Sequence, residues 1–173
     1  MLGKFRRCVS DADYAAFALY FIRHRKEFHA QFSLNDTLVH ILETIQKSRI
    51  ILVEDHLDNM IGWVHYHYFN ADYQDDSTGE IAFVNSVIIA EQFRSSRIFL
   101  QGFRHLVNQI ADENQAVKLF QFCALEDNAY LNRLYAKFAQ PIGKREGYNG
   151  MENIFSTEFQ LLQSYLNRES MTN

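Results

Sequence analysis

The chain has 173 residues, of which 47% are apolar and 22% charged, a composition typical of a globular protein with one sizeable core. The formal net charge of −4 gives no general attraction for nucleic acid or for an anionic membrane. No apolar run reaches the roughly 20 residues that span a bilayer. Because Pro141 is the only proline and no Pro- or Gly-rich linker occurs, we expect residues 1–173 to form a single domain.

The two cysteines and the residues after Met1 indicate the cellular compartment in which the protein is expected. Cys8 and Cys123 lie far apart in the sequence, and Cys123 sits in an apolar run, which favours two reduced thiols over a disulfide. Met1 is followed by charged residues rather than by the apolar core of a signal peptide. These features predict a cytoplasmic protein.

Apolar residues recur at helical spacing or in β-branched runs, and they predict the elements in chain order. In the first half we expect a strand at 4–9, helices at 11–29 and 35–45, and strands at 50–53, 60–69 and 80–89. In the second half we expect a helix from Ser95 or Ser96 to 113, a strand at 117–124, a helix at 128–138, and strands at 142–145 and 153–157, while residues 158–167 form a helix or continue the strand. Ser10 or Asp11 is expected to cap the first helix, and Asn35 or Asp36 to open the second.

This order predicts an α/β fold with a mixed sheet. A strand–helix–strand crossover in the second half requires a parallel pair of strands. The hairpins elsewhere make the rest of the sheet antiparallel. We therefore expect a mainly antiparallel central sheet that contains one parallel pair and is flanked by helices.

Residues 87–99, with Phe93 and Arg94, and residues 128–138, with Asn128, Leu134, Tyr135 and Lys137, are the two informative segments. Both resemble motifs of the GNAT N-acetyltransferase superfamily, and the order of elements is similar to that of its fold. Residues 87–99 are similar to the cofactor motif, in which a strand leads to an aromatic residue and an Arg or Gln, and a glycine-rich turn opens a helix. Phe93 and Arg94 fit the opening pair, but the two small residues are missing. Residues 128–138 resemble the family's second motif, with Leu131 where alanine is usual. The resemblance covers about residues 4–157 and implies that the parallel pair is splayed.

The resemblance also implies acetyl-CoA as the acyl donor. A helix N-terminus has unpaired amides and a partial positive charge, which suit a pyrophosphate. In the family a backbone amide near the end of the fourth strand faces the thioester carbonyl. The residues implicated in donor binding are Val87, Ile88, Ile89, Arg94, Ser95, Ser96, Arg97, Ile98, Phe99 and Asn128.

The missing glycines leave two interpretations of this helix start. Arg97 takes the first glycine position and Phe99 the second. In one interpretation the amides of residues 95–99 still bind coenzyme A, with charge-assisted contacts from Arg94 and Arg97. In the other, the Phe99 ring fills the cradle and the donor site is lost. Ser95, Ser96 and Asn128 can equally be ordinary helix caps.

The resemblance also implies catalytic residues, and each of them has a structural alternative. Tyr135 matches the tyrosine that can protonate the departing thiolate, although it can equally be a residue packed on the sheet. Glu80 starts a long strand where some family members carry a catalytic glutamate, or it is a solvated strand end. His65 and His67 point to one face of a strand and can serve as a base or be half-buried polar residues. Their spacing alone is a weak metal signal, and we expect no metal.

These features predict an acyl-CoA-dependent N-acetyltransferase acting on a small-molecule or protein amine by direct attack. The resemblance implies that residues 28–34 and 148–153 frame the acceptor. The acidic residues Asp72, Asp75 and Asp76 either attract a cationic amine or belong to a solvated loop. Neither nucleic acid nor a membrane is expected as a partner, and a homodimer is left open. The alternatives are a GNAT-like binding or interaction domain without catalysis, and a family member that takes its acyl group from an acyl-carrier protein.

Overall fold

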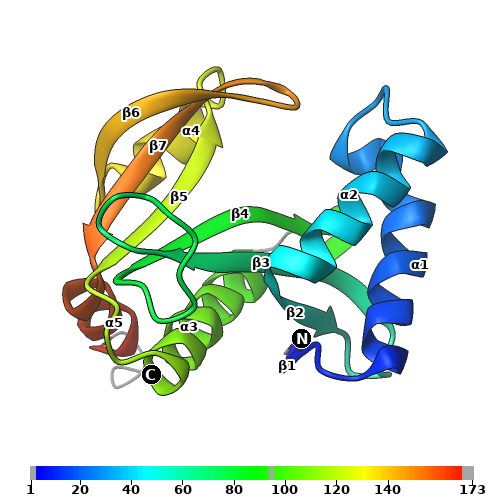
Figure 1. Cartoon of the computed structure of the whole chain (residues 1–173), viewed down its shortest axis with the longest axis horizontal. Coiled ribbons are helices and arrows are strands. Elements are labelled where there is room, and N and C mark those ends of the chain that lie inside the picture. The colour runs from blue at the N-terminus through cyan, green and yellow to red at the C-terminus, as the bar shows by residue number, and fades with distance from the viewer. Residues whose placement is uncertain (1–2, 94–95, 169–173) are drawn as a thin grey trace. The chain divides into compact units, whose positions relative to one another are not determined.

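The computed structural model describes residues 3–93 and 96–168, which form a mixed seven-stranded sheet and five α-helices. The strand order is β1-β2-β3-β4-β5-β7-β6, and β4 and β5 form the parallel pair (Figure 1). The strands are β1 (Lys4–Arg7), β2 (Arg49–Glu54), β3 (Met60–Phe69), β4 (Ile81–Ile89), β5 (Leu119–Leu125), β6 (Gln140–Gly147) and β7 (Gly150–Glu158). The helices are α1 (Asp11–Phe28), α2 (Leu34–Lys47), α3 (Ser96–Glu113), α4 (Ala129–Tyr135) and α5 (Phe159–Arg168), with a 3₁₀ turn η1 (Glu91–Phe93) before α3.

The predicted order of elements and the mixed sheet are confirmed, and several element ends differ. The second helix is capped by Ser33, and Asp36 closes a capping box three residues later instead of opening the helix. α4 ends at Tyr135 rather than 138. Residues 159–168 are helical rather than a continued strand. The cap of α3 lies outside the described residues.

The chain divides into two compact units, Met1–Tyr66 with Ser86–His105 and His67–Asn85 with Leu106–Asn173, and each is described here by itself. The division runs through β3, β4 and α3 rather than through a linker. Each unit therefore contains part of the sheet.

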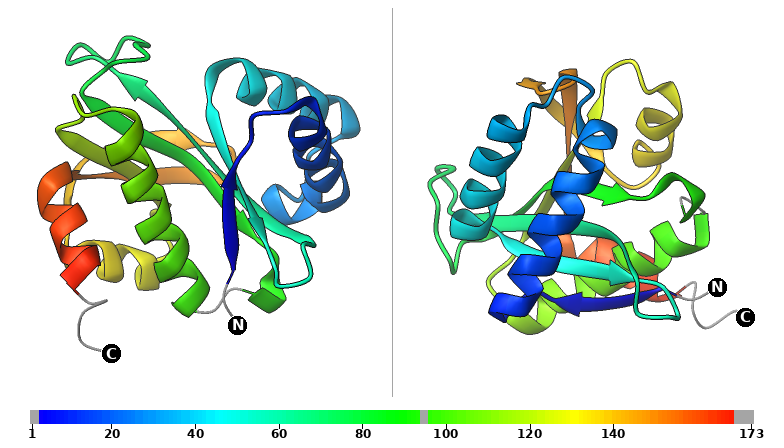
Figure 2. Two further views of the ribbon diagram at one scale, coloured as in Figure 1. Left: turned by 90° about the horizontal axis from the view of Figure 1, so that it is seen from below. Right: turned by 90° about the vertical axis from the view of Figure 1, so that its right-hand side faces the viewer.

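The first unit is built around aromatic side chains between α1, α2 and the sheet. β1, β2 and β3 form an antiparallel ladder, and α1 and α2 lie side by side (Figures 1 and 2). Phe17 and Phe21 of α1 meet Trp63 of β3 at ring-centroid distances of 5.2 and 5.1 Å. All three rings are at most 1% exposed, so they anchor both layers.

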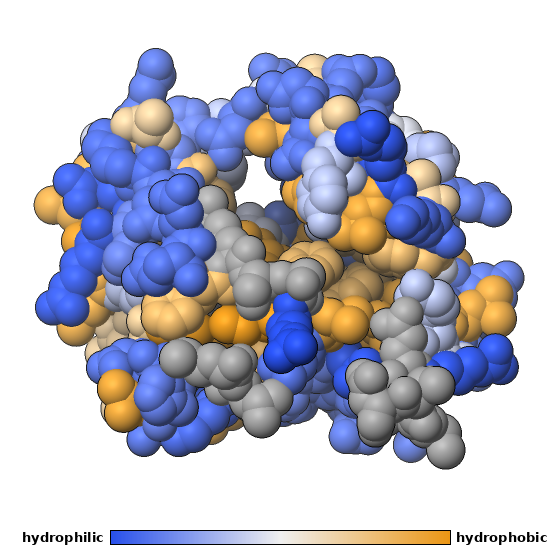
Figure 3. All heavy atoms as spheres, turned by 180° about the vertical axis from the view of Figure 1, so that it is seen from behind, coloured by the Kyte–Doolittle hydropathy of each residue, from blue (hydrophilic) through white to orange (hydrophobic). Residues whose placement is uncertain are grey.

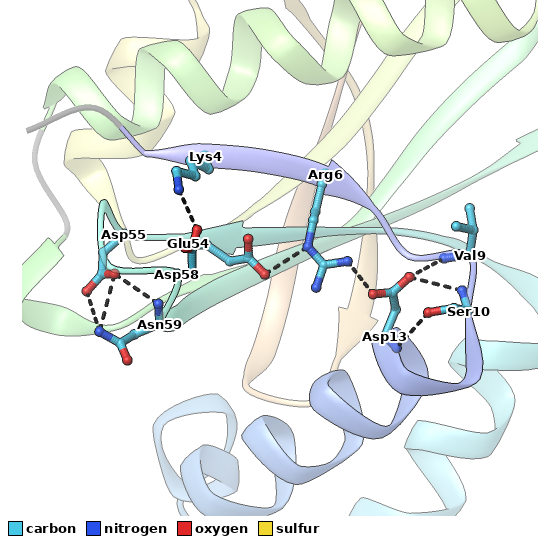
Figure 4. A network of polar contacts seen from close by, with 9 residues as sticks. All are labelled: Lys4, Arg6, Val9, Ser10, Asp13, Glu54, Asp55, Asp58 and Asn59. Carbon is cyan, nitrogen blue, oxygen red and sulfur yellow. Dashed lines mark hydrogen bonds and ion pairs between the residues drawn. The ribbon is translucent and has the colours of Figure 1, made fainter.

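Ion pairs and caps fasten the start of the chain to this unit (Figure 4). Arg6 on β1 donates from Nε to Glu54 of β2 at 2.8 Å and from Nη1 to Asp13 of α1. The Asp13 carboxylate also accepts the backbone amides of Val9 and Ser10 at 3.0 Å each, and Ser10 Oγ accepts the Asp13 amide. The guanidinium and the two amides hold the pKa of Asp13 well below its usual range.

In the second unit the parallel ladder is short. β4 and β5 pair over Ile81–Val84 and Leu119–Phe122, and the ladder then ends while both strands continue. β5 pairs antiparallel with β7 over its full length. A parallel pair whose ladder stops partway is what the predicted splay requires.

The two faces of the second unit's sheet differ in character. One face carries Phe122 and Phe155, whose rings pack on Tyr135 of α4 at 4.6 and 5.6 Å between centroids. α5 lies beside α3 (Figure 2, left). Asn108 of α3 and Asn167 of α5 exchange two amide hydrogen bonds of 3.3 and 3.2 Å. The other face, which we call the polar face, carries His67, Phe83, Asn85, Gln121, Cys123, Arg145 and Glu152.

The last strand in the sheet order, β6, is an exposed edge. It contains Pro141, and its register with β7 shifts between Pro141 and Gly143. On the face drawn in Figure 3, hydrophobic residues are interspersed among hydrophilic ones. Among the described residues no helix is both long enough and apolar enough to cross a membrane.

Candidate functional site

The end of β4 is the first part of the predicted donor site. β4 is buried from Ile81 to Val84, but Val87 is 48% exposed. The next two residues anchor the strand again, because Ile88 packs into the aromatic cluster with Trp63 and Ile89 packs into a second cluster. A strand that is otherwise buried is therefore open to solvent at a single stretch near its end.

Gly62 of β3 allows a close approach to this part of β4. A Cβ atom on Gly62 would lie 2.2 Å from the carbonyl oxygen of Ile88 and 2.9 Å from Cα of Ile89. Both atoms are backbone, so no side-chain rotation could relieve the clash. Ile61, next to it, accepts a hydrogen bond from the Ala90 amide at 2.8 Å. β3 thus fixes the backbone path on which the predicted thioester contacts of Val87, Ile88 and Ile89 depend.

The start of α3 lies against the same strand end. Ile98, in the first turn, is 4% exposed and packs with Ile89, Ile61 and Val53. Arg97 is exposed. Arg94, Ser95 and the side chain of Ser96 lie outside the described residues. The shared cluster places the first turn of an 18-residue helix beside the strand end, as a strand–turn–helix cradle for a phosphate requires.

The ring of Phe99 is half-buried and stacks on Phe103, one turn further along α3, at 6.0 Å between centroids. Gly102, on the same helix, is covered by the ring of Phe5 of β1, which would lie 2.8 Å from an added Cβ atom. α3 is therefore held against the sheet by aromatic contacts beyond its first turn. Whether Phe99 also obstructs a pyrophosphate stays a prediction.

Tyr135 lies at the C-terminal end of α4 in the second unit, with 8% of its surface exposed. Its ring packs on Phe122, Phe138 and Phe155. Burial raises the pKa of the phenol to about 12. Because of this raised pKa, the hydroxyl keeps its proton at neutral pH. It makes no hydrogen bond with another described residue, so its donor capacity is unused there.

Asn128 caps α4, as one of its two interpretations predicted. Its Oδ1 accepts the Leu131 amide at 3.0 Å. Asn132, one turn later, donates to the Leu125 carbonyl at 2.8 Å and accepts from Asn153 at 2.8 Å, which ties α4 to β5 and β7. Any contact of Asn128 with a pantetheine arm would have to come in addition to the cap.

Glu80 precedes the β4–β5 ladder and forms an ion pair with Lys118. The carboxylate oxygen lies 2.5 Å from Lys118 Nζ, and the two side chains are 33% and 72% exposed. An exposed pair of this kind is typical of a solvated strand end. Its predicted catalytic role stays a prediction.

The polar face brings together residues that the sequence separated. Asn85 Nδ2 lies 2.6 Å from His67 Nδ1. Arg145 lies over the Phe83 ring at 5.1 Å and donates to Glu152 at 2.7 Å. His67 was a candidate base from its spacing. Asn85 was missed because it and Ser86 lie within an otherwise apolar strand, and only the strand pairing reveals its partner.

His65 has a different environment from His67, although both lie on β3. It is 4% exposed, and its Nδ1 lies 3.1 Å from Oγ of Ser48. Its ring packs on Trp63 with the ring centroids 5.3 Å apart. Within the described chain, no three His, Cys, Asp or Glu side chains come together so that they could hold a metal ion. His65 therefore belongs to the core of the first unit.

The segments expected to frame the acceptor contribute unequally. Phe28 and Phe32 pack into the aromatic cluster and not outward. Tyr148 and Met151, beside the β6–β7 turn, are 57% and 44% exposed. In the acidic loop the Asp76 carboxylate accepts the Thr78 amide and hydroxyl at 2.9 Å, which lowers its pKa.

Comparison with known structures decides the fold. A spermidine N-acetyltransferase chimera from Vibrio cholerae aligns with 92% of this chain and 97% of its own, with a TM-score of 0.66 and 14% identity. A ribosomal-protein-S5-alanine acetyltransferase from Vibrio fischeri aligns with 90% of this chain and 92% of its own, with a TM-score of 0.63 and 15% identity. The chain has the GNAT fold. The sequence itself matches no protein-family model and no curated protein.

A third structure with the GNAT fold bears on the donor. A GNAT-family acetyltransferase from Elizabethkingia anophelis, with acetyl-CoA bound, aligns with 90% of this chain and 97% of its own, with a TM-score of 0.62 and 12% identity. The predicted fold class is thus confirmed. At these identities the likeness concerns the fold, and the chemistry of this chain has to be argued from its own residues.

Proposed function

We propose that this chain is an acetyl-CoA-dependent N-acetyltransferase that transfers the acetyl group directly to a primary amine. The observation that carries the proposal is the packing of Ile89 on Ile98, which sets the start of α3 beside the uncovered end of β4. In a GNAT fold this strand end and helix start are the parts that the donor needs. The second unit, taken by itself, contains a buried, protonated tyrosine and a polar sheet face.

The residues of the first unit fit the donor. The free amides of residues 96–99 would hold the pyrophosphate, because the first turn of a helix leaves its N–H groups without intrahelical partners. Arg97, which is exposed, would add a charge-assisted contact, as would Arg94 and Ser95. One backbone amide of the stretch Val87, Ile88 and Ile89 would face the thioester carbonyl and stabilise its developing negative charge.

Acetyl-CoA supplies an activated acyl group and a thiolate leaving group. Tyr135 would donate a hydrogen bond to the sulfur. Its pKa of about 12 is above that of an ordinary thiol near 8.5, so full proton transfer from the phenol to the thiolate is uphill. We therefore propose stabilisation of the departing sulfur by Tyr135, with the final proton supplied through solvent.

Direct attack is favoured over an acyl-cysteine intermediate. Burial raises the pKa of Cys8 to about 12 and that of Cys123 to about 11. A thiol needs to be a thiolate to act as a nucleophile, and neither cysteine is one at neutral pH. The acceptor amine itself then has to attack the thioester.

The acceptor class follows from the same chemistry. A primary amine on a small molecule or on a protein would serve, and Tyr148 and Met151 are exposed where the acceptor is expected. Nucleic acid and membranes are not proposed as partners, and a homodimer stays open. We also propose a cytoplasmic location, which the two free cysteines support because thiols stay reduced there.

One observation supports a second candidate, a GNAT-like binding domain without catalysis. Arg97 and Phe99 stand where glycines would let a phosphate approach the backbone. If the Phe99 ring obstructs the cradle, replacing it with alanine should strengthen coenzyme A binding. Unchanged or weaker binding in F99A would remove that argument.

The function is tested first by donor binding. Acetyl-CoA at 100 times its dissociation constant should stabilise the protein by about 2.7 kcal/mol, seen as a rise in the melting temperature. Arg97→Gln should weaken binding, whereas Arg23→Gln, an exposed arginine of α1, is the matched control. No shift at millimolar acetyl-CoA would remove the proposed function. With binding established, release of free thiol with a panel of amines measures turnover.

A further inference from the structure

We propose, on the basis of the proposed function, that Phe5 of β1 is the positioning residue that holds the start of α3 beside the end of β4 and thereby sets the affinity for acetyl-CoA. The donor needs both parts at once, because amides of the helix start and of the strand end would contact one molecule. A residue that fixes how these two parts lie acts on donor binding without touching the donor. All residues in this argument belong to the first unit.

β1 has a single apolar side chain. In the strand Lys4–Arg7 every residue other than Phe5 is basic. Lys4 and Arg6 form ion pairs with acidic residues of β2 and of the turn after it (Figure 4). Because side chains alternate along a strand, Phe5 points to the opposite side from these ion pairs. Its ring is therefore the apolar contact that β1 can offer to α3.

The Phe5 ring lies on α3 at the position of Gly102. A Cβ atom added to Gly102 would lie 2.8 Å from Cε1 of the ring and 3.4 Å from Cζ. Gly102 is an interior residue of α3, where glycine is a poor helix former. The close fit of the ring gives a structural reason for a glycine at a position where the helix alone would favour alanine.

The face of α3 that carries Gly102 also carries the anchor of the helix start. Ile98, Gly102 and His105 follow one another at spacings of four and three residues, so they share one face. His105 stacks on the Phe5 ring, with centroids 5.5 Å apart and 24° between the ring planes. Burial lowers the pKa of His105, so this imidazole is an uncharged aromatic partner at neutral pH. The stack holds the Phe5 ring in place over the helix.

Phe5 also packs against the cluster that joins the helix start to the strand end. The cluster consists of Val53, Ile61, Ile89 and Ile98, and the β1–β2 ladder pairs Phe5 with Val53. Ile89 is the last residue of β4 and Ile98 lies in the first turn of α3, and both are at most 9% exposed. The same ring thus supports the joint between β4 and α3 and fits closely on the helix one turn further along.

The alternative is that Phe5 only stabilises the fold. A purely structural ring contributes to the free energy of unfolding and leaves the affinity of the folded chain unchanged, whereas a positioning ring contributes to both. Tyr14 of α1 supplies the matched control. Its ring is also partly buried in the first unit, but it packs against the other apolar cluster, around Trp63.

The first experiment measures acetyl-CoA binding by calorimetry at a temperature at which every variant is folded. Phe5→Ala should weaken binding by roughly 2- to 30-fold, and Phe5→Leu, which keeps an apolar contact, should weaken it less. Tyr14→Ala should lower the melting temperature and bind the donor like the wild type. Wild-type affinity in Phe5→Ala, or an equal loss in Tyr14→Ala, would overturn the proposal.

The second experiment uses the fit between the ring and the glycine. Gly102→Ala should weaken donor binding although alanine favours the helix, because its methyl group meets the Phe5 ring. Phe5→Leu removes the two nearest ring atoms, so the double variant should bind acetyl-CoA more tightly than Gly102→Ala alone. Losses that simply add in the double variant would show that this contact does not control the donor site, against the proposal.

A measurement without donor separates this proposal from the proposed function. Hydrogen exchange of the amides of residues 100–104 reports on the first turns of α3, because each of these amides is bonded to a carbonyl one turn earlier. In Phe5→Ala these amides should exchange faster, while those of α1 keep their wild-type rates.

The two proposals therefore fail in different ways. If the wild type does not bind acetyl-CoA, the proposed function falls, and the exchange rates decide whether Phe5 holds the start of α3. If the wild type binds acetyl-CoA and Phe5→Ala changes neither binding nor exchange, Phe5 has no positioning role and the proposed function stands.

Discussion

The two histidines of β3 lie two residues apart on one strand and have become different kinds of residue. Around His65, in the first unit, α1 and α2 supply aromatic rings, and the imidazole is 4% exposed. Around His67, in the second unit, the neighbours are Asn85 and two phenylalanines, and the ring is half-buried. The comparison teaches that the packing partner, not the residue type, decides whether a polar group on this strand is part of a core or is available for chemistry.

The largest expected effect is a loss of stability when the aromatic core around His65 in the first unit is disrupted. Trp63→Ala should lower the free energy of unfolding by about 3–5 kcal/mol, because a fully buried ring leaves a cavity between α1 and the sheet. Urea unfolding followed by circular dichroism measures it. Leu19→Ala, on the exposed side of α1, is the control and should change stability by less than about 0.5 kcal/mol. Equal effects would mean that Trp63 does not hold the first unit together.

A second variant tests the contact between β3 and β4 in the first unit. Gly62→Ala should cost about 1–3 kcal/mol, since the new methyl group would meet the Ile88 carbonyl and force the strands apart. Gly143→Ala on β6 is matched to it, because an added Cβ meets nothing within 4 Å there. Donor binding should fall in G62A alone. A G62A protein that unfolds and binds like the wild type would show that the approach is unimportant.

Replacing Asp13 tests whether the polar residues of the first unit stabilise the fold. Asp13→Asn should lower the free energy of unfolding by about 1–2 kcal/mol at pH 7. Because the pKa of Asp13 is lower in the folded chain, its contribution is complete above the unfolded pKa near 4 and is lost as the pH falls further. The wild type and D13N should therefore converge in stability below pH 4. Asp11→Asn, at an exposed aspartate in the same turn, is the control and should change the free energy of unfolding at pH 7 by less than about 0.5 kcal/mol.

The smallest stability effect is expected on the polar face. Glu152→Gln leaves Arg145 partly exposed to water and should change the free energy of unfolding by less than about 1 kcal/mol. If this face serves binding, KM for the acceptor amine should change more than stability does. Steady-state kinetics and urea unfolding of one preparation decide the point. A large loss of stability with an unchanged KM would make the polar face structural, like the first unit.

Much of the fold was predictable because helical and strand periods are local properties of the sequence. The order of elements, the parallel pair and both ends of β3 follow from them. The cap of α2 was misplaced because Asn35 and Asp36 are good caps by residue type, whereas Ser33 wins by forming a capping box with Asp36. The helical state of residues 159–168 depends on the burial of Phe159, Leu162 and Leu166, which the sequence alone left undecided.

The candidate site was less predictable because its parts act through backbone and through distant partners. The resemblance found the strand end and the start of α3, where main-chain amides matter more than side-chain identity. It also found Tyr135, but not the ring cluster that raises its pKa. The partnership of His67 and Asn85 joins residues 18 positions apart and exists only once β3 and β4 are paired.

The irregular outer strand β6 has a consequence for how the protein behaves in a crowded solution. A free strand edge is a template on which another chain can add a strand. Pro141 lacks an amide proton, and the register shift beside it bends the backbone, so a foreign strand would find no continuous row of donors and acceptors. This border of the sheet is thereby protected against growth into ordered aggregates.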